Sequence, residues 1–172
     1  MEWCRVTNIS AHHHHEPATL HKTLNGISNL TCEHVESRVG ITALGGVEAL
    51  VKIMQTFPKC QAMQEGACCA LRNLTCCSIG KAKFIESGGI EVFLDAVTTH
   101  SDSAFLCQQA CWALLSIASD SKENTRLLVI LGGGAAVAKV STKWRDDGSV
   151  QTQVRAWANL IASEMQALTS DE

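Results

Sequence analysis

The chain has 172 residues, 46% of them apolar and 18% charged, an ordinary composition for a folded protein with a well-buried core. The formal net charge of −3 and the scattering of the 14 Lys and Arg residues argue against a nucleic-acid partner, which requires a concentrated basic surface. The longest apolar stretches, such as residues 127–131, are far shorter than the roughly 20 residues that span a bilayer. We therefore expect neither nucleic-acid binding nor membrane insertion.

The N-terminal segment, residues 1–19, is expected to lie outside the fold and to be disordered. It carries Glu2, Arg5 and the tract His12–His15 where a secretory signal would have a basic start and an apolar block, so export is not indicated. The His tract could bind a transition metal, but a low-complexity or tag-like stretch is the favoured interpretation. An intracellular location, cytoplasmic and/or nuclear, follows.

The cysteines are expected to pack as small hydrophobes in a reducing compartment. The adjacent pairs Cys68-Cys69 and Cys76-Cys77 cannot readily share a zinc ion, because neighbouring residues on a helix point about 100° apart. Cys107 and Cys111 could offer two ligands from one helical face, yet no His or carboxylate of the same repeat has obvious reach. We predict no metal site and no cofactor.

Two segments recur along the chain with a fixed period. A Gly-Gly pair followed by a mainly apolar stretch begins at Gly45, Gly88 and Gly132, and these starts lie 43 and 44 residues apart. Such a period is typical of helical solenoids, in which repeats stack on one another. A second segment repeats in the same way, at residues 67–74, 110–117 and 153–160, with a fainter copy at 23–30.

Glycines and polar loops divide each full repeat into three predicted helices. Gly88-Gly89 ends the first helix, because glycine accepts the positive φ that a sharp turn requires. The polar loop 100–103 then separates a second helix from a longer third one. The tail, residues 168–172, is expected to fray. The helices expected in the last two repeats cover residues 81–86, 90–98, 104–119, 122–131, 134–142 and 150–165.

The third helix of the middle repeat has one apolar face. Ala110, Ala113, Leu114 and Ile117 recur at helical spacing, so we expect them to face the core. The opposite side is expected to carry Gln109, Trp112 and Ser116.

Residues 112–118, Trp-Ala-Leu-Leu-Ser-Ile-Ala, are close to the form Trp-Ala-Leu-x-Asn-Ile/Leu-Ala of armadillo third helices. With the Gly-Gly turns, which argue against HEAT repeats, the pattern resembles the armadillo repeat family of the importin-alpha and beta-catenin type. The resemblance implies an all-α fold, a right-handed α-α superhelix or armadillo solenoid of about three full three-helix repeats plus a partial N-terminal one. The expected armadillo-repeat domain is 20–162, with repeats at about 20–31, 32–75, 76–118 and 119–162, followed by a helix end and acidic tail at 163–172.

The resemblance also implies a groove, lined by the third helices, that binds an extended peptide of a partner protein. In the family an Asn of each third helix bonds the ligand backbone and a Trp one turn earlier flanks its side chains. An amide both donates and accepts hydrogen bonds, so a row of Asn can hold an extended strand of any sequence. The Asn positions here are Asn29, Asn73, Ser116 and Asn159, the Trp positions are Asn25, Cys69, Trp112 and Arg155, and Arg72 and Gln109 flank them.

The ligand predicted from these positions is not a classical basic import signal, and binding of a basic segment in the manner of a nuclear-import adaptor is the less favoured alternative. Only Trp112 fills a Trp position, whereas import adaptors hold lysines between Trp walls and acidic pockets. Arg72 and Arg155 favour a ligand with some acidic character. Alternatively, Asn73 and Asn159 only cap or hydrogen-bond adjacent helices.

An alternative to a complete interaction module is a fragment of a longer solenoid that stacks on further repeats. A fragment would expose the apolar face of Leu24, Ile27 and Leu30 and self-associate through its uncapped N-terminal end, whereas a complete module would be monomeric. The C-terminal helix, with Glu164 and Gln166, has the polar character of a capped end. Catalysis is not expected, because the sequence has no nucleophile elbow, phosphate-binding loop or paired catalytic carboxylates.

Overall fold

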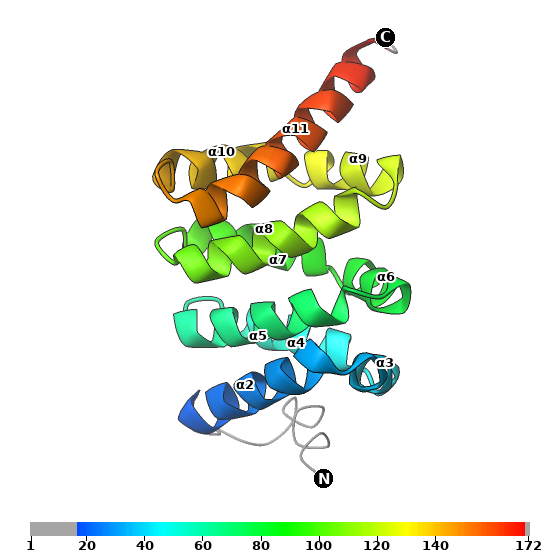
Figure 1. Ribbon diagram of the computed structural model, residues 1–172, viewed down its shortest axis with the longest axis vertical. Helices are drawn as coiled ribbons and strands as arrows, with labels where there is room; N and C mark the ends of the chain where they lie inside the picture. The colour runs from blue at the N-terminus through cyan, green and yellow to red at the C-terminus, as the bar shows by residue number, and fades with distance from the viewer. Residues whose placement is uncertain (1–16, 171–172) are drawn as a thin grey trace. The chain divides into compact units, whose positions relative to one another are not determined.

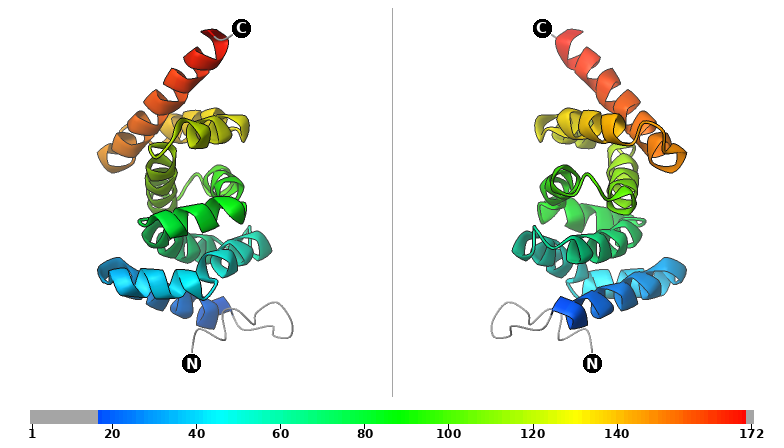
Figure 2. Two further views of the ribbon diagram at one scale, coloured as in Figure 1. Left: turned by 90° about the vertical axis from the view of Figure 1, so that its right-hand side faces the viewer. Right: turned by 90° about the vertical axis from the view of Figure 1, so that its left-hand side faces the viewer.

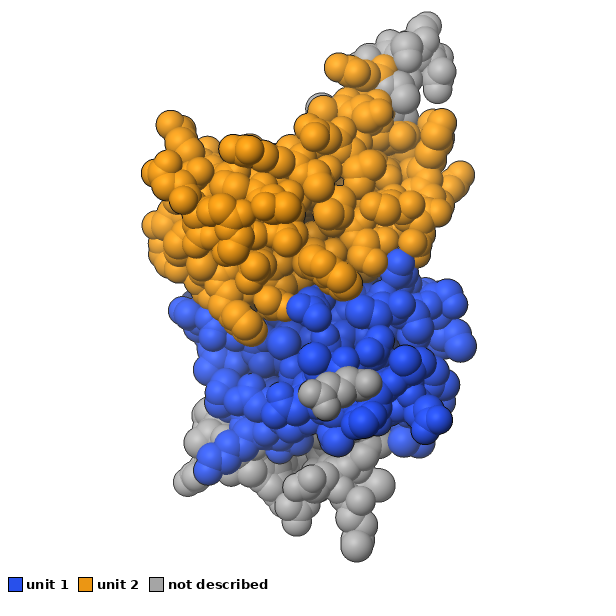
Figure 3. Space-filling view, viewed as in Figure 1, with its two compact units in different colours: residues 1–89 blue, residues 90–172 orange. Residues whose placement is uncertain are grey.

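The computed structural model describes residues 17–170, so the His12–His15 tract lies outside the described part of the chain. Every regular element from residue 17 to residue 170 is an α-helix (Figure 1). The chain divides into two compact units, residues 1–89 and 90–172, which are coloured separately in Figure 3. Within the described range no single helix is long and apolar enough to cross a membrane, although α9 and α10 would qualify by length and composition if counted together across a 77° bend.

Unit 1 consists of the helix of the partial repeat, the complete first full repeat and the first helix of the next. Helix α2 packs along α5, α4 also packs against α5, and α3 contacts α6 (Figures 1 and 2). The helices are α2 (Pro17–Glu33), α3 (Val35–Ala43), α4 (Gly46–Thr56), α5 (Gln61–Leu74) and α6 (Ser78–Glu86).

Unit 2 is organised around α11, which packs against α8, α9 and α10. The predicted helix bounds are correct to within about three residues except at the C-terminal end of α11, which was expected near residue 165. This helix continues to residue 170, and its end projects beyond α9 and α10 (Figures 1 and 2). The helices are α7 (Gly89–Thr99), α8 (Ala104–Ala118), α9 (Lys122–Ile130), α10 (Gly133–Lys143) and α11 (Gly148–Ser170).

The Gly-Gly turns have the conformation that the sequence predicts. The first glycine of each pair is left-handed, with φ of 79° at Gly45, 76° at Gly88 and 91° at Gly132. The second glycine serves close packing instead, since a Cβ on Gly89 would lie 2.4 Å from the Phe84 ring. One glycine is therefore needed for backbone conformation and the other for space.

A buried glutamine closes the end of the second helix in two of the repeats. Gln64 donates through Nε2 to the carbonyls of Met54, at 2.8 Å, and Phe57, at 3.0 Å. Gln151 repeats this with Ser141, at 3.0 Å, and Trp144, at 2.8 Å. Each amide bonds one carbonyl in the last turn of the helix, where intrahelical donors run out, and the carbonyl of the residue just after the helix.

Backbone carbonyls near the C-terminal ends of the third helices accept hydrogen bonds from side chains of the helix that follows. Arg38 of α3 donates through Nε to the Thr31 carbonyl at 2.7 Å, and Asn124 of α9 donates through Nδ2 to the Ile117 carbonyl at 3.0 Å. In α6 the backbone itself approaches the end of α5, since a Cβ on Gly80 would lie only 2.0 Å from the Leu74 carbonyl oxygen. Thr31, Leu74 and Ile117 are thus equivalent, at a constant spacing of 43 residues.

Leu24 and Ile27 are buried, contrary to the exposed face expected for a fragment. Their exposed fractions are 0% and 5%, because this face of α2 packs on α5, where Gly66 lies against Leu24. Leu30, at 56%, is exposed as expected.

Three cysteines of the third helices, Cys68, Cys107 and Cys111, are fully buried. Burial raises the pKa of the Cys107 thiol to about 11 and that of Cys111 further, so both stay protonated and pack as apolar groups. Cys69 is half-buried and accepts a hydrogen bond from Ser28 Oγ at 3.0 Å. Between residues 17 and 170 no cluster of three or more His, Cys, Asp or Glu could hold a metal ion.

Replacing glycine by alanine should change the free energy of unfolding in opposite directions at two positions of unit 1. At Gly45 an added Cβ meets open space, so Gly45→Ala should destabilise by about 1–2 kcal/mol through the left-handed backbone alone. Gly26 also faces open space but lies inside α2, so Gly26→Ala should stabilise by about 0.5–1 kcal/mol. Urea unfolding followed by circular dichroism measures both. Equal effects of the same sign would contradict the assigned turn.

Candidate peptide-binding surface

The outward face of each third helix is a stripe of partly exposed residues at spacings of four, three and four. On α5 and the turn after it the stripe starts at Glu65 and runs to Cys76. The equivalent stripe on α8 starts 43 residues later, at Gln108, and runs to Ser119. The intervening members are Cys69 and Arg72 on α5, and Trp112 and Leu115 on α8.

The partial repeat aligns one residue differently from the sequence prediction. The end of α2 at Thr31 corresponds to Leu74, and the buried residues of the two helices match at the same 43-residue spacing. Asn29 therefore corresponds to Arg72, and Leu30 rather than Asn29 corresponds to Asn73. By the same spacing the Trp position of α2 is held by Gly26 and not by Asn25. Both Asn25 and Asn29 are nevertheless exposed.

Asn73 hydrogen-bonds the adjacent helix α2, which is the alternative to a ligand-binding role. Its side chain is 4% exposed and faces α2, not solvent. Through Nδ2 it donates to the Ser28 carbonyl at 3.0 Å and to Thr31 Oγ1 at 3.3 Å. This amide holds α5 against α2, so it is not presented on the outward face.

Gln109 is also buried, at 8%, and does not lie on the outward face where we predicted it. Consecutive residues are rotated by about 100° on a helix, and the outward stripe of α8 takes Gln108 instead. Trp112, a member of that stripe, and Ser116, which lies next to it, are half-buried.

Arg155 and Asn159 are the most available of the predicted positions in unit 2. Both are exposed and lie one turn apart on α11. Neither side chain has a hydrogen bond or ion pair with another residue of the described range. They can therefore offer a guanidinium and an amide to a ligand without breaking an existing contact.

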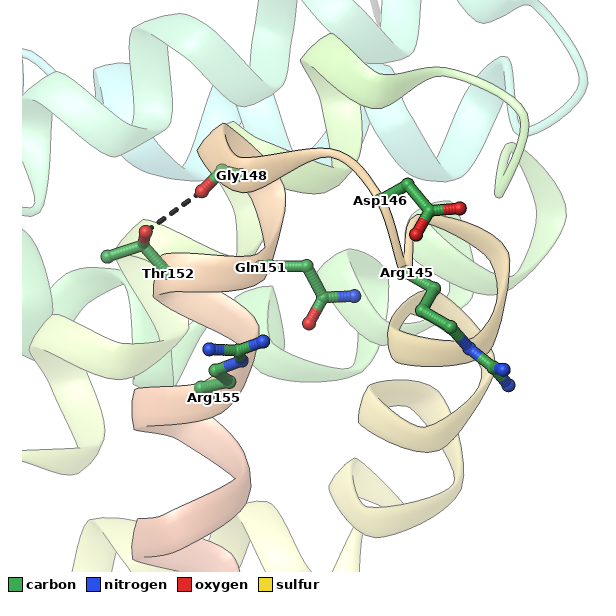
Figure 4. A pocket seen from close by; sticks show the side chains of 6 residues that line it. All are labelled: Arg145, Asp146, Gly148, Gln151, Thr152 and Arg155. Atoms are coloured by element: carbon green, nitrogen blue, oxygen red, sulfur yellow. Dashed lines mark hydrogen bonds between the residues drawn. The ribbon is translucent and has the colours of Figure 1, made fainter.

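A pocket of about 370 Å³ lies at the start of α11 (Figure 4). Arg155 is among the residues predicted to line the peptide-binding groove. The loop before α11 contributes Arg145 and Asp146 to the lining. The one sequence signal for the role of this loop is its closeness to Arg155 along the chain. The lining residues are Arg145, Asp146, Gly148, Gln151, Thr152 and Arg155.

Asp147, next to the pocket, caps the N-terminus of α11. Its Oδ1 accepts from Ser149 Oγ at 2.6 Å and from the amides of Ser149, at 2.9 Å, and Val150, at 3.2 Å. These hydrogen bonds, the one from the Ser149 hydroxyl first, lower the pKa of Asp147. Because the first amides of α11 are already occupied, the positive groups of the pocket are its two arginines.

A model of the Armadillo/beta-catenin-like repeat matches residues 41–76, which run from the end of α3 through α5. Residues 41–76 thus match an armadillo repeat, and the chain as a whole is similar to armadillo-repeat proteins. Its all-α fold is the solenoid of that family.

Two curated relatives contain segments similar to these armadillo repeats. Protein aardvark of Dictyostelium discoideum is 29% identical over 137 residues, which is 73% of this chain and 18% of aardvark. The beta-catenin-like protein hmp-2 of Caenorhabditis elegans is 37% identical over 49 residues, 28% of this chain and 7% of hmp-2. The chain thus spans less than a fifth of the length of either relative.

A solved structure of a designed armadillo repeat protein in complex with the peptide (KR)4 has the same fold. It superposes with a TM-score of 0.74 at 18% identity, covering 92% of this chain and 62% of the designed one. At this identity the similarity establishes the armadillo fold alone.

Replacing two asparagines at equivalent repeat positions should separate structural from exposed amides. Asn73→Ala should destabilise by about 1–3 kcal/mol, because it removes two buried hydrogen bonds between α5 and α2 and leaves a gap between the helices. Asn159→Ala removes an exposed side chain and should change stability by less than about 0.5 kcal/mol. Urea denaturation of the two variants measures the difference, and an equal loss would show that Asn73 is not a tether.

Proposed function

We propose that this chain is a non-catalytic protein-interaction module that holds an extended segment of a partner protein on the outward faces of its third helices. The armadillo fold supports a protein-interaction or scaffold role. We place this role inside the cell, in the cytoplasm or nucleus, and expect the ligand to be a protein and not a nucleic acid.

One observation supports the proposal above the others. On α11, Arg155 and Asn159 are exposed and lack side-chain partners in the described range, although polar side chains elsewhere in the fold are used to close helix ends. An amide can both donate to and accept from the backbone of an extended strand, and a guanidinium can bind a carbonyl or a carboxylate. The two groups together suit a peptide better than an apolar small molecule.

The designed neighbour provides a parallel for the mode of binding. It holds a peptide that alternates Lys and Arg. In this chain Arg72 and Arg155 occupy outward positions, and we propose a ligand of different charge bound to the same face of the fold.

Affinity capture from a cell lysate tests the proposal with the variant Arg155→Ala/Asn159→Ala. If the outward face of α11 binds the partner, this variant should lose at least about tenfold in affinity, since groups that bond a ligand contribute on the order of 1–3 kcal/mol each. Circular dichroism should remain unchanged, because both residues are exposed.

The matched control is Lys52→Ala/Gln55→Ala, which removes one cation and one amide from the exposed side of α4. It should retain the partner fully. Equal retention by both variants would place binding elsewhere on the molecule.

A second function, association with further repeats or a second copy, is favoured by exposed apolar residues of unit 1. Leu30, near the C-terminal end of α2, is 56% exposed, and Val35 and Val39 lie one turn apart on α3 at 62% and 46%. Leu44, directly after α3, is 63% exposed. Apolar side chains gathered in this way favour burial against another surface.

Sedimentation velocity over a range of concentrations tests this second function. Val39→Glu should shift any self-association toward the monomer, because burying a carboxylate in an apolar interface is costly. Ile130→Glu, on α9, alters an apolar residue that is 77% exposed and should have no effect. A monomer at all concentrations would leave stacking without support.

A further inference from the structure

The pocket at the start of α11 contains cations without partners in a region where other cations are paired. Arg126 of α9 and Lys139 and Lys143 of α10 each have a hydrogen-bond or ion-pair acceptor. Arg145 and Arg155 have none within residues 17–170. The paired groups are Arg126 with Glu164 at 2.6 Å, Lys139 with the Thr98 carbonyl at 2.5 Å, and Lys143 with Asp102.

The acidic residues near the pocket do not neutralise Arg155. Asp147 is engaged with the first amides of α11. The carboxylate of Asp146 points away from Arg155 and Gln151 (Figure 4). Arg145 also extends away from Gln151, at the other side of the pocket. Arg155 is therefore the cation beside the Gln151 amide, and Arg145 adds positive charge at the other side of the pocket.

Gln151 contributes an acceptor. Its Nε2 is committed to the carbonyls of Ser141 and Trp144, which fixes the orientation of the amide. The oxygen is turned toward Arg155, between that residue and Arg145 (Figure 4). The pocket thus combines a guanidinium donor with a carbonyl-type acceptor in a fixed position.

We propose that this pocket binds an acidic residue, Glu or Asp, of an extended partner segment. The carboxylate pairs with the Arg155 guanidinium, whose planar fork suits two parallel hydrogen bonds to a carboxylate. A backbone N–H of the same segment donates to the Gln151 oxygen. This assignment rests on the proposed function and adds to it the charge of the ligand.

The acceptor distinguishes a peptide from a free anion. Inorganic phosphate at neutral pH presents mainly acceptor oxygens, so only a P–OH group could donate to the Gln151 oxygen. An extended peptide presents both a carboxylate and backbone N–H groups, so it satisfies both parts of the pocket. An acidic peptide segment is therefore favoured over a phosphate ion.

Fluorescence anisotropy with labelled octapeptides tests the assignment on the full chain. The probe (EA)4 should bind at least about tenfold more tightly than (QA)4, and Arg155→Gln should remove about tenfold of that affinity. Arg145→Gln should cost about two- to threefold, because that group lies at the other side of the pocket from Gln151. Lys122→Gln, which removes one exposed charge from α9, is the matched control and should cost less than about twofold.

Three results would overturn the assignment. The first is equal binding of (EA)4 and (QA)4, or binding of neither. The second is equal affinity of (EA)4 for Arg155→Gln and Lys122→Gln. The third is displacement of (EA)4 by millimolar phosphate beyond the effect of sodium chloride at the same ionic strength, which would indicate a general anion site. Where (QA)4 binds and Asn159→Ala weakens its binding, the proposed peptide-binding function stands and only the acidic pocket fails. Where neither peptide binds, the capture experiment with Arg155→Ala/Asn159→Ala and its matched control decides the proposed function separately.

Discussion

The fold depends on satisfying the backbone carbonyls at the ends of its helices. Short helices joined by tight turns leave many such groups, and burial without a partner costs about 1–3 kcal/mol each. The chain meets this requirement with side chains that recur at the repeat period, such as Gln64 and Gln151 for the second helices. Arg38 and Asn124 do the same for the third helices. Because these contacts link specific residues, they fix the register of each repeat to a single residue.

A register fixed to one residue decides which side chains remain for binding. Arg72 and Asn73 are neighbours in sequence, but Arg72 belongs to the outward stripe of α5 whereas Asn73 is buried against α2. Gln108 and Gln109 differ in the same way on α8. On a helix a shift of one position rotates a side chain by about 100°, which is enough to exchange a binding role for a structural one.

The helices, their Gly-Gly turns and the family resemblance could be predicted from the sequence, because they depend on local periodicity. The positive φ of Gly45, Gly88 and Gly132 follows directly from the spacing of the glycines. The alignment of the partial repeat could not be predicted in this way. Aligning Asn29 with Asn73 maximised the similarity of residue type between repeats. The contacts and burial of α2 and α5 instead align Asn29 with Arg72. The pocket before α11 was missed because it depends on a loop and a helix meeting in space.

The same residue type therefore serves two purposes at equivalent repeat positions. Asn73 lies between two packed helices, where an unpaired amide would be costly, and its hydrogen bonds go to α2. Asn159 lies on α11 at an exposed position, so its amide is not required by the packing. A repeat protein can in this way use one asparagine position for cohesion in one repeat and leave it for recognition in another. The freedom of Arg155 and Asn159 is thus a consequence of where α11 lies in its unit, not of residue type, and this is why recognition in this chain is assigned to α11 more strongly than to α5.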